Sequence, residues 1–185
     1  MKKWLILFFS IFFIGCGSIK DLSNTPTRKV EAYLNKYQIA DDSIFKDIYD
    51  DVMDIFNTTD LSEDEKIRYE KMMKKNYGDM TYEVKDERID GDNAIVTAEI
   101  NVKDLAKVKE NADEYLEDHK EEFQDENGIL NDSLFHNYLF EHWDSDSEII
   151  TYTIDFTLYK NEDGEWKLDS LTKEQKQKLH GTYSI

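Results

Sequence analysis

Residues 80–102, MTYEVKDERIDGDNAIVTAEINV, alternate apolar and polar side chains on both sides of a turn sequence. This alternation places every second side chain on one face, which is the pattern of a half-buried β-strand. The turn is Asp90-Gly91-Asp92-Asn93. The apolar face holds Met80, Tyr82 and Val84 before the turn and Ala94, Val96, Ala98, Ile100 and Val102 after it. The stretch therefore predicts an antiparallel hairpin.

Two more strands are predicted near the C-terminus. Residues 148–160 alternate in the same way, with Ile150, Tyr152, Ile154, Phe156 and Leu158 on the inward side. The turn sequence Asn161-Glu162-Asp163-Gly164 follows, and then a short strand with Trp166 and Leu168 inward. Together with the hairpin, these segments predict a mainly antiparallel sheet of about four strands.

Helical spacing of apolar residues appears on both sides of the hairpin. Three helices are expected before it, over about 26–39, about 44–56 and 62–78, the last opening with a Ser62–Glu65 capping box. Helices over about 104–124 and 131–144 form a two-helix insertion between the second and third strands, and 171–181 predicts a short terminal helix. The expected fold class is α+β, with N-terminal helices packed on a curved sheet.

The N-terminus has the layout of a bacterial secretory signal. Lys2 and Lys3 precede an apolar run that ends at Cys16 and is shorter than the roughly 20 residues that a membrane-spanning helix needs. Phe13-Ile14-Gly15-Cys16 resembles a bacterial lipobox, with Phe13 in place of the usual Leu. This resemblance implies cleavage before Cys16, a diacylglycerol on its sulfur and further acylation, such as palmitate, at the new N-terminus.

These features predict three parts of the chain. Residues 1–15 are the lipoprotein signal peptide, residues 16–25 are the lipidated cysteine and a tether, and residues 26–185 are a single α+β domain. Two or more acyl chains would hold the protein stably on the extracytoplasmic face of a membrane in the bacterial envelope.

Composition excludes several classes of protein. The 185 residues carry 41 acidic and 23 basic side chains, a net charge of −18 that would repel nucleic-acid phosphates. One cysteine cannot form a disulfide framework or a multi-cysteine metal site. The chain has no HExxH motif and no glycine-rich phosphate loop, and His136 and His142 are six residues apart, which is wrong for a helical zinc pair. We expect no metal, no cofactor and no catalytic set.

Short motifs resemble the nuclear-transport-factor-2-like, or cystatin-like cone, superfamily, which includes small bacterial lipoproteins. They are Thr25-Pro26, Gly164-Glu165-Trp166-Lys167 and Leu171-Thr172. The resemblance implies a curved sheet that wraps a long N-terminal helix around a pocket. Tyr82, Tyr152 and Phe156 would line that pocket; the alternative is that they are core residues with satisfied hydroxyl groups.

The predicted helix at 131–144 carries a second aromatic stripe beside its main apolar face. His136, Phe140 and Trp143 follow one another at i, i+4 and i+7. The functional interpretation is an exposed patch for a protein partner. The alternative is that the helix lies between the sheet and the helix at 104–124 and buries both of its faces.

The sequence therefore favours a lipid-anchored binding or interaction module without catalytic activity. Its partners would be the membrane, through the anchor, and an envelope protein or a small apolar ligand. The alternative is a small hydrolase- or isomerase-type enzyme that uses the cone pocket, with Tyr82 or Tyr152 as the acid.

Overall fold

The computed structural model describes residues 24–56, 61–143, 145 and 148–184. In this part of the chain, three helices precede a four-stranded sheet, and further helices follow the second and fourth strands. The elements, in chain order, are α2 (Pro26–Gln38), α3 (Asp42–Ile55), α4 (Glu63–Gly78), β1 (Thr81–Asp90), β2 (Asn93–Lys103), α5 (Leu105–Asp118), the 3-10 helix η1 (Lys120–Phe123), α6 (Asp132–His142), β3 (Ile149–Lys160), β4 (Trp166–Leu168) and α7 (Lys173–His180).

The sheet is antiparallel throughout, in the order β1-β2-β3-β4, and the predicted α+β class is confirmed. The predicted hairpin is also confirmed, because Asp90 pairs with Asn93 around a two-residue turn. Gly91 has a φ of 59°, at the position where a type II′ turn favours glycine. All five predicted inward side chains of β2 are buried, as are four of the five in β3.

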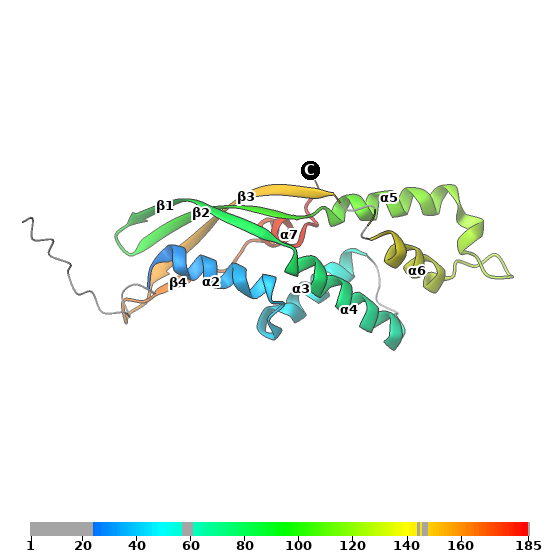
Figure 1. Ribbon diagram of the computed structural model, residues 1–185, viewed down its shortest axis with the longest axis horizontal. Helices are drawn as coiled ribbons and strands as arrows, with labels where there is room; N and C mark the ends of the chain where they lie inside the picture. The colour runs from blue at the N-terminus through cyan, green and yellow to red at the C-terminus, as the bar shows by residue number, and fades with distance from the viewer. Residues whose placement is uncertain (1–23, 57–60, 144, 146–147, 185) are drawn as a thin grey trace, which may run out of the picture.

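Helices cover one face of the sheet (Figure 1). α2 contacts β1, β2 and β4, α4 contacts β2, and α7 contacts β2 and β3. The helices bury their apolar stripes against the sheet; in α2 these are Val30, Leu34 and Tyr37. The opposite face of β3 carries the exposed Thr151, Thr153, Asp155 and Thr157. The core therefore lies between one face of the sheet and the helical layer.

Strand β1 departs from simple alternation halfway along its length. Its register shifts between Val84 and Asp86, and such a bulge moves the following residues to the opposite face. Beyond the bulge, Glu87 accepts hydrogen bonds on Oε2 from Thr27 N at 2.9 Å and Thr27 Oγ1 at 2.6 Å. The second half of β1 therefore binds the start of α2 through a carboxylate, which suits the positive end of a helix.

The predicted helix at 104–124 is divided in the structure. α5 ends at Asp118, and η1 turns the chain so that buried Phe123 packs against Tyr115 and Tyr138. The Tyr115 and Tyr138 rings stack at 4.5 Å between α5 and α6, with His119 stacked on Tyr115 and His142 on Tyr138. We call α5, η1 and α6 the helical arm; it extends past the end of the sheet (Figure 1).

The segment after α7 joins the arm to the rest of the fold. Gly181 ends α7 in the left-handed conformation, with a φ of 70°. Its carbonyl oxygen accepts hydrogen bonds from Leu105 N at 2.7 Å and Ala106 N at 3.0 Å. These N–H groups are in the first turn of α5, where no carbonyl of the same helix can reach them.

Candidate functional site

The side chains predicted to line a pocket are packed in the core or bonded to other residues. Phe156 is fully buried. The Tyr152 hydroxyl donates to the Tyr183 carbonyl oxygen at 3.0 Å, and the half-buried Tyr82 hydroxyl donates to Asn35 Oδ1 at 3.0 Å. This arrangement matches the alternative of core residues with satisfied hydroxyl groups.

The predicted aromatic patch on α6 faces the interior. His136 and Trp143 are buried, and Phe140 is partly buried against the core. Trp143 packs on Phe56 at 5.0 Å and on Tyr69 at 5.6 Å between ring centroids. α6 thus buries this stripe against α4 and against Phe56, the C-cap residue of α3, whereas the alternative drawn from the sequence placed the helix between the sheet and α5. The three side chains do not form an exposed patch.

The predicted lipidation site, Cys16, lies outside the described residues. Within the described ranges, no cluster of three or more His, Cys, Asp or Glu side chains is placed to hold a metal ion. Among the same residues, no helix combines the length and the apolar character needed to cross a bilayer.

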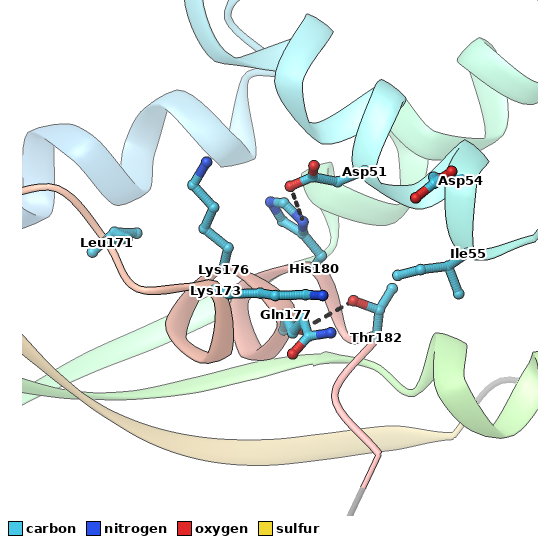
Figure 2. Close-up of a pocket in the computed structure, with 9 residues that line it drawn as sticks. All are labelled: Asp51, Asp54, Ile55, Leu171, Lys173, Lys176, Gln177, His180 and Thr182. Carbon is cyan, nitrogen blue, oxygen red and sulfur yellow. Dashed lines mark hydrogen bonds and ion pairs between the residues drawn. The ribbon is translucent and has the colours of Figure 1, made fainter.

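A cleft of about 400 Å³ lies between α3 and α7 (Figure 2). We call it the α3–α7 cleft. It is lined by Asp51, Asp54 and Ile55 from α3, by Leu171, Lys173, Lys176, Gln177 and His180 from α7 and the residues before it, and by Thr182. This volume is within the range of small-molecule sites in proteins.

Opposite charges line the two sides of the cleft. Asp51 and Asp54 are three residues apart on α3, and Lys173 and Lys176 have the same spacing on α7, so each pair lies along one side of its helix. Figure 2 shows the two carboxylates on α3, with Lys176 extending upward from α7 beside His180 and Lys173 lying below the carboxylates. In the described chain no ion pair joins these acids to these lysines, and Asp51 instead contacts His180.

His180 closes the inner end of the cleft and is only 3% exposed. Its Nδ1 lies 3.6 Å from Asp51 Oδ2, and its Nε2 lies 3.4 Å from the Tyr37 hydroxyl oxygen. Burial, with a further contribution from the charge of Lys176, lowers the pKa of His180 to about 3. The imidazole is therefore neutral near pH 7. The Asp51 carboxylate would favour the protonated imidazole, but it is half-exposed, so water screens its charge.

The chain of polar groups continues from His180 through Tyr37 to the partly buried Tyr33. Tyr37 and Tyr33 place their hydroxyl oxygens 3.3 Å apart. Burial raises the pKa of both phenols, which therefore stay protonated at neutral pH. A small internal space next to this chain is lined by Tyr33, Tyr37, Asp51 and His180, among other residues.

Local bonds fix α7 where it lines the cleft. Thr172 and Gln175 form a capping box at its first turn. The Gln175 side chain also donates from Nε2 to the Asp155 carbonyl oxygen of β3 at 2.6 Å, while Lys178 pairs with Glu174 at 2.6 Å. α7 is thus held to the sheet on one side and presents Lys173 and Lys176 to the cleft on the other.

The sequence pattern does not by itself indicate this site. The available signals were the i, i+3 spacing of Lys173 and Lys176, and an acidic row on α3 formed by Asp47, Asp51 and Asp54. Such rows on short helices are common on solvated surfaces, so they identify a site only when the fold brings the two helices together.

Comparisons with known proteins show no family. No protein-family profile matches the sequence, and no curated protein sequence matches it. Among solved structures, the chain is similar to that of "a putative lipoprotein (ycdA) from Bacillus subtilis", with a TM-score of 0.46 and 13% sequence identity over 77% of this chain and 51% of that chain. The chain thus spans about half the length of that protein, and a likeness this distant carries no argument about function.

Proposed function

We propose that this protein is a lipid-anchored binding module of the bacterial envelope, and that its α3–α7 cleft holds a small zwitterionic ligand such as an amino acid or a short peptide. The observation that carries the ligand class is the facing arrangement of two carboxylates on α3 and two lysines on α7 around a cleft of about 400 Å³. This replaces the apolar ligand expected from the sequence, because the predicted pocket residues do not line this cleft.

A ligand with one positive and one negative group fits these walls. Its ammonium group would approach Asp51 and Asp54, and its carboxylate would approach Lys173 and Lys176. Charge-assisted hydrogen bonds of this kind are the strong ones in protein sites. Leu171 and Ile55, which also line the cleft, supply the apolar surface that a ligand side chain would contact.

The position of His180 favours binding over catalysis. A general base needs a nitrogen directed at the substrate proton. In His180, Nδ1 faces Asp51 and Nε2 faces the buried Tyr37 hydroxyl, so the imidazole supports the wall of the cleft. The enzyme predicted as the alternative would need Tyr82 or Tyr152 as an acid, and both hydroxyl groups already have backbone or amide acceptors.

The anchor is proposed from the sequence alone. Residues 1–15 would be removed as a signal peptide, Cys16 would carry the lipid, residues 16–25 would form the tether, and residues 26–185 would form one extracytoplasmic domain. The resemblance to the nuclear-transport-factor-2-like superfamily, with a two-helix insertion between β2 and β3, likewise stays a prediction from the sequence. Growth with radiolabelled palmitate should label the processed chain that begins at Cys16, and the C16S variant should lose the label.

Ligand binding is tested on the full chain purified from membranes in detergent. Native mass spectrometry should show a retained small molecule, and titration calorimetry with free amino acids and dipeptides should show binding. The D51N and K176Q variants should each weaken that binding by about tenfold or more, equivalent to about 1.4 kcal/mol. The D50N variant, on an exposed residue of α3 outside the cleft, is the control. No adduct and no heat with any of these compounds would reject the proposed ligand class.

A further inference from the structure

The tip of the helical arm is an ordered turn between η1 and α6. Asp125 holds it: its Oδ1 accepts hydrogen bonds from Asn127 N at 2.8 Å and from Ile129 N at 3.0 Å. Gln124 and Leu130 form an isolated antiparallel bridge across the turn, and Asn131 N donates to the Phe123 carbonyl oxygen at 2.7 Å. The backbone of the tip is therefore well bonded, although the tip contributes only Phe123 to the buried core.

This ordered turn and the first turn of α6 expose three large apolar side chains within six residues of sequence. Ile129 is 63% exposed, Leu130 is 47% exposed and Leu134 is 41% exposed. We call these three side chains the tip patch. The other large apolar side chains exposed in the described chain are spread over the C-cap of α2, α4, β1 and both ends of β3: Ile39, Ile67, Ile89, Ile149 and Tyr159. Single exposed apolar residues are ordinary on protein surfaces, whereas a cluster indicates an interaction site.

The tip patch lies among acidic side chains. Residues 120–134 contain five acids, Glu121, Glu122, Asp125, Glu126 and Asp132, and one base, Lys120. All five acids are exposed, and none forms an ion pair with another side chain in the described ranges. A second copy of this chain would bring like charges together here, and an anionic membrane surface would also be repelled. The complementary surface is an apolar pocket bordered by Lys or Arg.

The tip also faces away from the start of the described chain. Asn24 is held at the turn between β3 and β4, where its side chain bonds to the Gly164 carbonyl oxygen at 3.1 Å and to Trp166 N at 3.0 Å. The β4 end of the sheet and the helical arm lie at opposite ends of the long axis (Figure 1). With the proposed anchor at Cys16, the tip would point away from the membrane.

We propose that the tip patch is a docking site for a second protein, and that the partner presents an apolar pocket bordered by basic side chains. The apolar contacts supply the affinity, and the acidic border selects the partner and speeds its approach. This proposal is independent of the α3–α7 cleft. It moves the expected partner contact from the stripe on α6 to the tip of the helical arm, because His136 and Trp143 are buried.

A pair of synthetic peptides tests the chemistry on the full chain in detergent. One is an amphipathic helix of leucine and lysine; the other has equal charge, with serine in place of leucine. Fluorescence anisotropy should show the leucine peptide binding at least about tenfold more tightly, and an I129S/L130S variant should remove that difference. The I67S variant, which changes an exposed apolar residue of α4, should retain it. Equal binding of both peptides, or no effect of the double variant, would overturn the proposal.

Photocrosslinking in cells tests the partner itself. A photoreactive phenylalanine analogue at position 130 should form a covalent adduct with one other protein, and the same analogue at position 67 should not. Mass spectrometry of the adduct should locate the crosslink beside Lys or Arg in an apolar segment of that protein. An adduct with a second copy of this chain, with lipid or with no protein at all would contradict the assignment. Because Ile67, Ile129 and Leu130 are all exposed, the I129S/L130S and I67S variants should keep the unfolding temperature of the parent protein.

Discussion

The imidazole Nδ1 of His180 lies 3.6 Å from the Asp51 carboxylate, yet the two side chains do not form an ion pair at neutral pH, because burial keeps the imidazole uncharged. The histidine is in α7 and the aspartate is in α3. The contact therefore joins the two helices that form the cleft, and its character depends on pH.

Acid should destabilise the protein through His180. The pKa of this group is lowered from 6.5 to about 3 in the folded state, so its contribution to stability is complete above pH 6.5 and is lost as the pH falls toward 3. The loss should approach ~1.4 kcal/mol per pH unit in this window. Urea unfolding of the wild type and the H180Q variant between pH 7.5 and pH 5 measures it. The variant should have the shallower dependence, and parallel curves would show that His180 does not cause it.

Substitution of Gly181 should be severe. A Cβ added at Gly181 would lie 1.9 Å from the Lys103 carbonyl oxygen, and the φ of 70° is one that alanine rarely adopts. We expect G181A to lower the free energy of unfolding by about 3 kcal/mol or more. G164A is the matched control: Gly164 has a φ of 74° with open space around it, so its cost should be only about 1 kcal/mol. Equal losses in chemical denaturation would contradict the clash with Lys103.

Trp143 should behave as a core residue. Its side chain is 1% exposed and packs on Phe56 and Tyr69. Truncation in W143A should cost about 3 to 5 kcal/mol, the range for large buried side chains. I67A, on a side chain that is 64% exposed, should change the stability by less than about 0.5 kcal/mol. A W143A protein as stable as its parent would restore the exposed-patch interpretation of this helix.

Variants of the two capping boxes distinguish an effect on protein stability from an effect on ligand binding. Ser62 caps α4 and Thr172 caps α7 with the same pattern of side-chain and backbone bonds. S62A and T172A should each cost about 1 kcal/mol in thermal or urea unfolding. Only T172A should also weaken ligand binding, because α7 lines the cleft and α4 does not. The same loss of ligand affinity in both variants would mean that general destabilisation, and not the position of α7, controls the site.

The sheet and most of the helices could be predicted because their signals are local. Alternation in β2 and β3 identifies the buried face from the sequence, and the Ser62–Glu65 capping box marks the start of α4. The break after Asp118 could not be predicted, because it depends on Phe123 packing against rings that α6 supplies. The bulge in β1 could not be predicted either, because it is stabilised by the contact of Glu87 with Thr27, which is distant in the sequence.

The site could not be predicted for a related reason. The cleft forms between α3 and α7, which are far apart in the sequence, and neither helix carries a motif that is typical of a ligand site. The aromatic stripe on α6 was visible in the sequence, but its spacing does not show whether the stripe faces solvent or is covered by another helix. In the structure α4 is that covering helix, with Tyr69 against both Phe140 and Trp143.

The hydrogen bonds from Leu105 and Ala106 to the Gly181 carbonyl oxygen have a consequence for biosynthesis. Gly181 follows every strand of the sheet in the chain, so the first turn of α5 lacks this acceptor until translation has passed α7. A nascent chain would therefore remain incompletely folded throughout most of its synthesis. If the proposed signal peptide directs export of the unfolded chain, this delay would keep the polypeptide competent for passage through a secretion channel, and folding would finish on the far side of the membrane.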